Sequence, residues 1–185
     1  MKRILITSVL VGLGLPTVSF AADSLDVDFT ANILATTCTI TIVQDGGPQV
    51  NDDGGDNYSL SIASVGLDKI VKSDVSAQAD FKLVASGCSS GYKKIFTKLS
   101  GSSISGNLIK NESTDSPAAN IGMGIKRRNA ADTAFIAPNN TSIVEWNGTD
   151  KNEGLKLTVA LRETTPGTGR TGKFRAKATF NFTYE

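Results

Sequence analysis

The stretch 174–184, near the end of the sequence, alternates strictly between apolar and polar side chains. In an extended backbone, successive side chains point to opposite faces, so all the apolar residues would share one face. These residues are Phe174, Ala176, Ala178, Phe180, Phe182 and Tyr184. At about 3.3 Å per residue, the stretch would span roughly 36 Å, about twice the usual strand length. The pattern predicts a long terminal β-strand, whose free edge would be a template for pairing with another chain.

The first 21 residues have the features of a secretory signal peptide. Lys2 and Arg3 give it a positive start, residues 4–15 are mostly apolar, and the small residues Ser19 and Ala21 precede the expected cleavage site. The apolar run is too short for a membrane-spanning helix. Cleavage would leave residues 22–185, a length that suits one domain with a single core.

Both cysteines of the sequence, Cys38 and Cys88, lie in the part that is expected to be exported. Export brings thiols into an oxidising compartment, where these two would form a disulfide. With 49 residues between them, the chain-entropy model gives the bridge about 4 kcal/mol of stability. Two buried free thiols are the alternative.

A second alternating stretch lies between the expected cleavage site and Cys38. Its apolar positions are Leu25, Val27, Phe29, Ala31 and Ile33, and polar residues separate them. The period of two predicts a strand. Two interpretations remain open for it: an ordinary first strand of a sandwich, or an arm at a free N-terminus that pairs with another molecule.

The middle of the chain consists of short strand-like segments separated by turn signals, and no long stretch shows a helical stripe. Strands are expected at 39–43, 58–62, 81–85, 121–125 and 155–161, and an irregular or briefly helical connection at 67–78. Residues 51–57 are expected to form a polar loop, and the basic cluster 126–128 a solvated loop. The pattern is typical of a single all-β domain.

Residues that usually carry catalysis or bind metals are scarce. The chain has no histidine, which removes the usual general base and the commonest nitrogen ligand of zinc. The carboxylates within 52–56 miss the spacing of a calcium loop, and no glutamate closes it. We therefore expect no enzyme activity, no cofactor and no metal site.

One segment, 167–173, has the glycine and lysine spacing of a phosphate-binding loop. That motif requires Ser or Thr at the next position and then a helix, whereas Phe174 follows and begins a strand pattern. The net charge of the whole sequence is +1, which gives no support for a nucleic-acid partner.

Several features together resemble the pilin subunits of chaperone-usher fimbriae of the type 1-like kind. They are the signal peptide, the alternating arm before Cys38, the segment F-K-L-V-A-S-G-C at 81–88, N-I-G-M-G-I at 120–125 and the T-P-G turn at 165–167. Gly172 stands fourteenth from the end and Tyr184 is penultimate, as in the chaperone-recognition motif of that family. One departure is Ala31, which stands where many arms of the family have glycine.

The resemblance implies an all-β fold, an incomplete immunoglobulin-like β-sandwich that lacks its final strand and has a hydrophobic groove beside the C-terminal strand. It divides the chain into a signal peptide at 1–21, a donor-strand arm at 22–34 and a pilin domain at 35–185. The implied donor side chains are Leu25, Val27, Phe29, Ala31 and Ile33. The implied groove and chaperone-recognition strand comprises Gly172, Phe174, Ala176, Ala178, Phe180, Phe182 and Tyr184.

The resemblance also implies how such a chain works. A periplasmic chaperone would fill the groove with its own strand, and the arm of an incoming subunit would replace that strand at an outer-membrane usher. The chain would then be a structural subunit of an extracellular fimbrium on a Gram-negative cell, contributing to adhesion, with the chaperone, the usher and other pilin subunits as partners. A self-contained secreted sandwich that binds an unknown ligand is the alternative.

Overall fold

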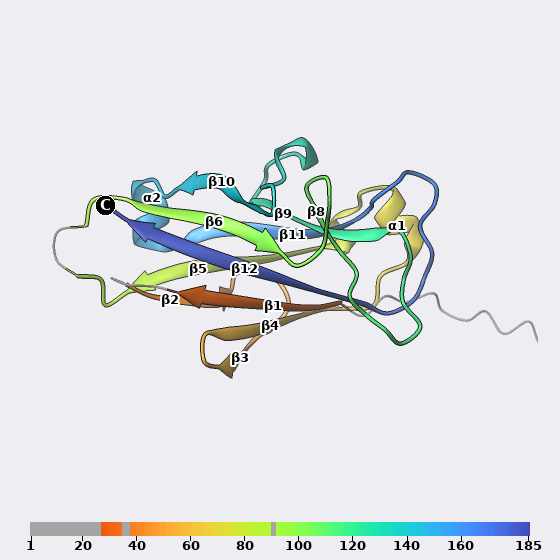
Figure 1. Ribbon diagram of the computed structural model, residues 1–185, viewed down its shortest axis with the longest axis horizontal. Helices are drawn as coiled ribbons and strands as arrows, with labels where there is room; N and C mark the ends of the chain where they lie inside the picture. Colours follow the sequence, from red (N-terminus) through yellow and green to blue (C-terminus); the bar gives the residue numbers. More distant parts are fainter. Residues whose placement is uncertain (1–26, 35–37, 90–91) are drawn as a thin grey trace, which may run out of the picture.

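In a computed structural model, the chain forms a sandwich of two six-stranded β-sheets (Figure 1). The structure describes residues 27–34, 38–89 and 92–185, the first of these ranges through its backbone alone. The first sheet has the strand order β10-β6-β12-β1-β4-β3, and the second has the order β2-β5-β11-β9-β8-β7. The expected signal peptide and the donor position Leu25 lie outside the described residues.

The strands of the first sheet are β10 (Asn139–Glu145), β6 (Ile95–Gly101), β12 (Phe174–Tyr184), β1 (Val27–Leu34), β4 (Asn57–Ile62) and β3 (Val50–Gly54). Those of the second are β2 (Thr39–Gln44), β5 (Gln78–Ser86), β11 (Leu155–Glu163), β9 (Ile121–Arg127), β8 (Leu108–Lys110) and β7 (Ile104–Ser105). The helical segments are short: α1 (Leu67–Val71), α2 (Gly148–Glu153) and the 3-10 turns η1 (Val75–Ala77) and η2 (Asp132–Ala134). None of the described helices is long and apolar enough to cross a membrane.

The core lies between the two sheets and follows the alternation of the strands. In β12 the side chains at 174, 176, 178, 180 and 182 are buried, as the sequence pattern predicts. Phe180 meets Phe81 of β5 edge to face, with ring centroids 6.2 Å apart, and Phe182 meets Trp146 in the same manner at 6.4 Å. The indole of Trp146 donates a hydrogen bond to the Thr97 hydroxyl at 2.7 Å, so its one polar atom is satisfied in the core.

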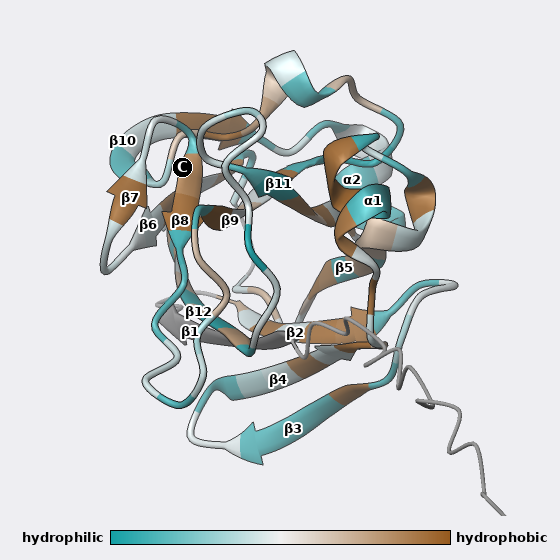
Figure 2. Cartoon of the chain, turned by 90° about the vertical axis from the view of Figure 1, so that its right-hand side faces the viewer, coloured by the Kyte–Doolittle hydropathy of each residue, from teal (hydrophilic) through white to brown (hydrophobic). Residues whose placement is uncertain are grey.

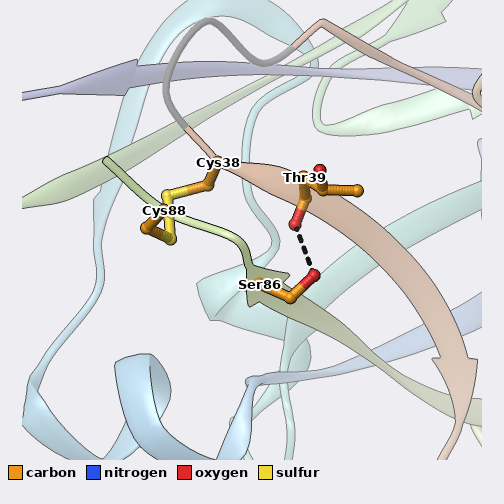
Figure 3. The surroundings of a disulfide bond; sticks show 4 residues. All are labelled: Cys38, Thr39, Ser86 and Cys88. Carbon is orange, nitrogen blue, oxygen red and sulfur yellow. Dashed lines mark hydrogen bonds between the residues drawn. A yellow bond between two sulfur atoms is a disulfide. The ribbon is translucent and has the colours of Figure 1, made fainter. Parts of the chain in front are cut away.

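The predicted disulfide between Cys38 and Cys88 is confirmed (Figure 3). Cys38 directly precedes β2 and Cys88 follows β5, and these two strands pair antiparallel with Thr39 opposite Ser86. The Ser86 hydroxyl also donates to the carbonyl oxygen of Thr39 at 3.4 Å. The bridge therefore closes the end of a strand pair in the second sheet.

The prediction of a polar loop at 51–57 is wrong for most of its length. Residues 50–54 form the edge strand β3, which pairs antiparallel with β4, and the turn is confined to the glycine-rich segment that joins them. Asn and Asp are rare in strands in general. At an exposed edge they face water, and Figure 2 shows β3 as largely hydrophilic.

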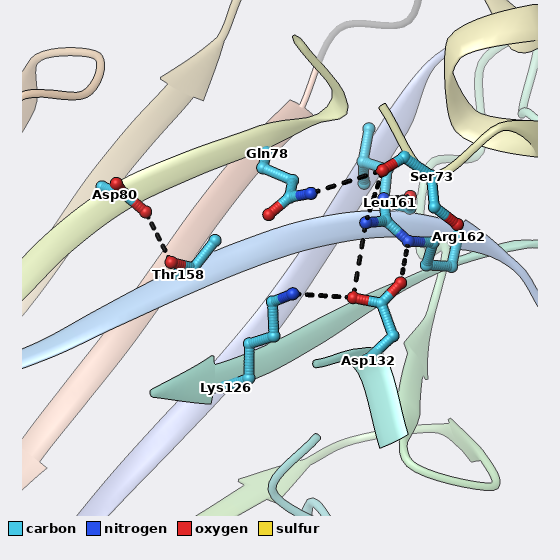
Figure 4. Close-up of polar contacts among 8 residues, drawn as sticks. All are labelled: Ser73, Gln78, Asp80, Lys126, Asp132, Thr158, Leu161 and Arg162. Atoms are coloured by element: carbon cyan, nitrogen blue, oxygen red, sulfur yellow. Dashed lines mark hydrogen bonds and ion pairs between the residues drawn. The ribbon is translucent and has the colours of Figure 1, made fainter. Parts of the chain in front are cut away.

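The prediction of a solvated loop at 126–128 is also wrong, because Lys126 and Arg127 end strand β9. Lys126 is only 6% exposed and Arg162 of β11 only 7%. The carboxylate of Asp132 pairs with both, at 2.7 Å from Lys126 Nζ and 2.6 Å from Arg162 Nε (Figure 4). We call Lys126, Asp132 and Arg162 the ion cluster; it holds η2 against the outer face of the second sheet.

Candidate functional site

The most unusual feature of the first sheet is its central strand, which comes from the N-terminal arm. Strand β1 lies between β12, with which it pairs parallel, and β4, with which it pairs antiparallel (Figure 1). The strands from Cys38 onward thus leave one position open in the middle of this sheet, and we call that position, between β12 and β4, the strand slot. It corresponds to the predicted groove, and here the arm of the same chain occupies it.

The strand pairing places the apolar positions of the arm opposite buried residues of both strands that flank the slot, β12 and β4. Positions 27, 29, 31 and 33 of β1 pair with Phe174, Ala176, Ala178 and Phe180 of β12. Positions 27, 29 and 31 pair on the other side with Ile62, Leu60 and Tyr58 of β4. All these wall residues are buried. A shift of the arm by one residue would place its polar positions opposite the buried wall residues. Only shifts by an even number of residues keep the apolar positions of the arm opposite these residues.

The smallest buried side chains of β12 lie in the middle of the part that pairs with the arm. Ala176 and Ala178 are the small residues there, and Phe174 and Phe180 flank them. Position 29, which carries the largest apolar residue of the arm, is in register with Ala176.

The β4 wall carries a tyrosine whose hydroxyl is satisfied. Tyr58 is 6% exposed, and its hydroxyl is hydrogen-bonded to the backbone of Ile42 in the second sheet. Burial raises the pKa of Tyr58, and the negative charges of Asp52 and Asp56 raise it further. The hydroxyl stays protonated and links the two sheets beside the slot.

The start of β12 is held by a loop that the sequence analysis missed. The Asn111 side chain donates to the carbonyl oxygens of Ala118 and Lys173, both at 2.8 Å, and accepts from Arg175 N at 2.9 Å. A β-carbon on Gly172, whose φ is +152°, would lie 2.5 Å from Ala118 N. Only glycine allows this close approach, so the predicted motif residue Gly172 has a structural role at the entrance of β12.

At its other end, β12 extends beyond the arm. Pairing with β1 stops at Asn181, whereas pairing with β6 continues to Tyr184. Beyond Tyr184, Glu185 exchanges main-chain hydrogen bonds with Lys94, at 3.1 and 2.8 Å. The last residues of β12 are thus fixed on the β6 side.

The two sets of predicted site residues, as far as the structure describes them, lie side by side in one molecule. Insertion of the arm into the slot of another molecule stays a prediction. Asn111 carried no sequence signal, because a single loop asparagine gains its role from backbone groups that lie 7, 62 and 64 positions away. Within the described ranges, no three His, Cys, Asp or Glu residues form a group that could hold a metal ion.

Comparisons with known proteins give consistent results. The sequence model of the fimbrial protein family matches residues 27–185. The chain is 49% identical over 184 residues to the fimbrial-like protein YadM of Escherichia coli K12, covering 96% of this chain and 95% of that protein. Its fold is similar to that of the P pilus rod subunit PapA, with a TM-score of 0.55 and 14% identity over 82% of this chain and 94% of the other. The similarity to PapA supports an immunoglobulin-like sandwich that lacks its last strand.

Proposed function

This chain belongs to the fimbrial protein family, and we propose that it polymerises by inserting its N-terminal arm into the strand slot of a neighbouring subunit. Membership makes the chain a structural subunit of an extracellular fimbria of Gram-negative cells, with other pilin subunits as partners, and not an enzyme. The proposed divisions are a signal peptide at 1–21, the arm at 22–34 and the pilin domain at 35–185.

The observation that carries the proposal is the position of β1. The strand in the middle of the first sheet precedes the disulfide-linked domain, and it pairs through its main chain on both sides. Without it, β12 and β4 would have unpaired edges and the sheet would divide into two parts. In strand addition, main-chain hydrogen bonds supply affinity and alternate side chains set the register. The arm of a second copy has the same sequence and can supply both.

The proposed route to the fibre follows the family. A periplasmic chaperone first occupies the slot beside β12, and the arm of the next subunit replaces it at an outer-membrane usher. The proposed donor residues are Leu25, Val27, Phe29, Ala31 and Ile33. The proposed acceptor residues are Gly172, Phe174, Ala176, Ala178, Phe180, Phe182 and Tyr184, and assembly contributes to adhesion through the finished fimbria.

One observation favours a second candidate function. Because β1 fills the slot of its own chain, a folded monomer needs no partner to complete the sheet. Such a monomer would be a self-contained secreted binding module. The two functions differ in whether the arm ever leaves its own slot.

The test uses the full chain, produced in cells together with chaperone and usher. Unheated and boiled samples are compared on a denaturing gel for wild type, Phe29→Asp and Thr30→Asp. Position 29 is in register with buried Ala176 and Leu60, so a carboxylate there would be desolvated without a partner. Position 30 is in register with Lys177 and Ser59, neither of which is buried, and serves as the matched control.

We expect a ladder that collapses on boiling for wild type and for Thr30→Asp, and no ladder for Phe29→Asp. Chaperone-bound, soluble Phe29→Asp subunit with an intact disulfide would show that folding is retained. Monomer in both lanes for wild type would refute polymerisation, and a normal ladder for Phe29→Asp would refute the assigned donor position.

A further inference from the structure

The outer face of the second sheet, on the side away from the strand slot, is hollowed over strands β5, β11 and β9. The hollow has a volume of about 410 Å³, within the range of roughly 300–1,000 Å³ that is usual for small-molecule sites. The turn after β2, the start of η1 and the segment after β9 surround it. We call it the outer hollow, and its polar side chains are those of Gln78, Asp80, Lys126, Asn129 and Thr158.

A row of three polar side chains crosses the floor of the outer hollow. Thr158 of β11 is directly opposite Asp80 of β5 on one side and Lys126 of β9 on the other. Residues opposite each other on neighbouring strands present their side chains on the same face, and Figure 4 shows Asp80 next to Thr158, with Lys126 on the adjoining strand. Thr158 is 4% exposed and Lys126 is 6% exposed, so these two groups lie at the bottom of the hollow and not on open surface.

The charges at this floor are already balanced. The ion cluster pairs two cations with one carboxylate. Beside it, Arg128 pairs with Asp45 at 2.7 Å and with Asp80 at 3.2 Å. Together these contacts balance three cations with three carboxylates. A charged ligand would add an uncompensated charge to this arrangement, which is costly away from water, whereas a neutral ligand would not.

The floor still has room for further hydrogen bonds. The Thr158 hydroxyl donates to Asp80 Oδ1 at 2.5 Å, and Lys126 Nζ donates to Asp132 at 2.7 Å. An ammonium group has three donors, a carboxylate has about four acceptor positions, and the oxygen of a hydroxyl group can accept as well. The floor thus offers donors and acceptors side by side. A ligand hydroxyl, which both donates and accepts, satisfies the two kinds at once.

The rim of the outer hollow is held in place by contacts within the chain. Arg128 donates to the carbonyl oxygen of Asp45 at 2.5 Å, and the Gln44 side chain donates to the carbonyl oxygen of Gly47 at 2.6 Å. A β-carbon on Gly47 would clash with the carbonyl oxygen of Asp80, so glycine lets this turn approach β5 closely. Because the site is formed in advance, a ligand would not have to order it, which lowers the cost of association.

We infer that the outer hollow binds a neutral, hydroxyl-rich ligand, namely a sugar residue of a glycan, whose hydroxyl groups accept from Lys126 and donate to Asp80. Sugars are the common biological molecules that carry several adjacent hydroxyl groups and no charge. This site goes beyond the exchange of the arm, because it lies on the sheet that takes no part in that exchange. Repetition of the site along a fimbria would raise its avidity through multivalency, and this one step rests on the proposed function.

The test uses the full chain as a folded monomer and follows its backbone amide signals by NMR. The probes are the methyl glycosides of glucose, galactose and mannose, with sulfate and methylammonium as charged controls. We expect saturable shifts at the outer hollow with at least one glycoside and none with either ion. Thr158→Val keeps the shape of the side chain and should weaken binding about fivefold through the lost hydroxyl.

A second variant removes the acceptor that we assign to the ligand. Asp80→Asn should weaken binding of the glycoside at least about tenfold, since hydrogen bonds to charged groups are the stronger ones. Arg128 keeps its pairing with Asp45 in this variant, and the urea midpoint checks that the fold is retained. The matched control is Thr41→Val in β2, a threonine of the same sheet that does not line the outer hollow, and it should bind as the wild type does.

The results that would overturn the inference are distinct from those that bear on the fibre. The absence of saturable shifts with all three glycosides would overturn it, and so would shifts of equal size with sulfate or methylammonium. Equal affinity of wild type, Thr158→Val and Asp80→Asn would overturn the assigned floor. A monomer that binds a glycoside but never forms a ladder with chaperone and usher would remove the proposed function and leave the site.

Discussion

The two sheets of the sandwich are held together in different ways. The second sheet is closed by links within the chain, namely the Cys38–Cys88 bridge beside β2 and β5 and the ion cluster on its outer face. The centre of the first sheet is the strand β1 of the N-terminal arm, which pairs through its main chain with β12 and β4. The second sheet and the strands linked to it from Cys38 onward form what we call the frame, and β1 lies outside these links, as a strand that is exchanged under the proposed function would have to.

The frame also positions the slot. Phe81 of β5 contacts Phe180 of β12 edge to face, and the Tyr58 hydroxyl is bonded to Ile42 of β2. Both walls of the slot are therefore supported from the second sheet. Substitutions in the frame should lower the stability of the whole domain, whereas substitutions in the arm should act mainly on the exchange of strands.

The largest effect should come from the disulfide. Replacing both Cys38 and Cys88 by serine removes a bridge that spans 50 positions, and the chain-entropy model assigns about 4 kcal/mol to it. We expect the free energy of unfolding, measured by urea titration of the monomer, to fall by that order. A loss below about 1 kcal/mol would contradict the view that the bridge stabilises the frame.

A smaller loss should follow from breaking the ion cluster. Asp132→Asn removes the charge that neutralises two buried cations, and hydrogen bonds to charged groups contribute about 1.5–3 kcal/mol. The matched control is Asp115→Asn, since Asp115 pairs with Lys173 on the surface, with its side chain 72% exposed. The control should leave the urea midpoint unchanged, and an equal loss for both variants would show that burial does not matter here.

The ion cluster also predicts a pH dependence. Burial alone would raise the pKa of Asp132, but its hydrogen bonds and ion pairs with Arg162 and Lys126 outweigh burial and lower it. A carboxyl whose pKa is lowered by folding stabilises the folded state above its ordinary pKa of about 4, and this contribution is lost as the pH falls through the folded value. Wild type should therefore lose more stability than Asp132→Asn between about pH 4 and pH 2, and parallel curves would refute this.

Much of the fold could be predicted because alternation is a local property. The period of two in 27–33 and 174–184 places each stretch in a strand, and in 174–184 it separates the buried positions from the others. Cys38 and Cys88 needed only the expectation of export. These features depend on neighbours within a few residues, or on the compartment, and not on tertiary structure.

The remaining features depend on partners that are distant in the sequence. The charge of Lys126 is compensated in its buried position by the carboxylate of Asp132, six positions away, which also pairs with Arg162. No local rule places these residues together. The strand β3 forms because β4 offers an edge, although its own residues disfavour strands. Local pattern also cannot say which molecule the arm pairs with, because the same residues satisfy the slot of their own chain and that of another.

The smallest effect should come from the arm itself, at Ala31. Glycine in the middle of a strand costs about 0.5–1 kcal/mol relative to alanine, because it loses more conformational entropy on folding. If β1 folds as part of the monomer, Ala31→Gly should lower the free energy of unfolding by that amount. Ala79→Gly in β5 is the matched control in the frame and should cost at least as much, since Ala79 is 4% exposed. A loss of unfolding free energy for Ala79→Gly with none for Ala31→Gly would mean that pairing of the arm does not contribute to the stability of the monomer. The frame would then be stable without the arm.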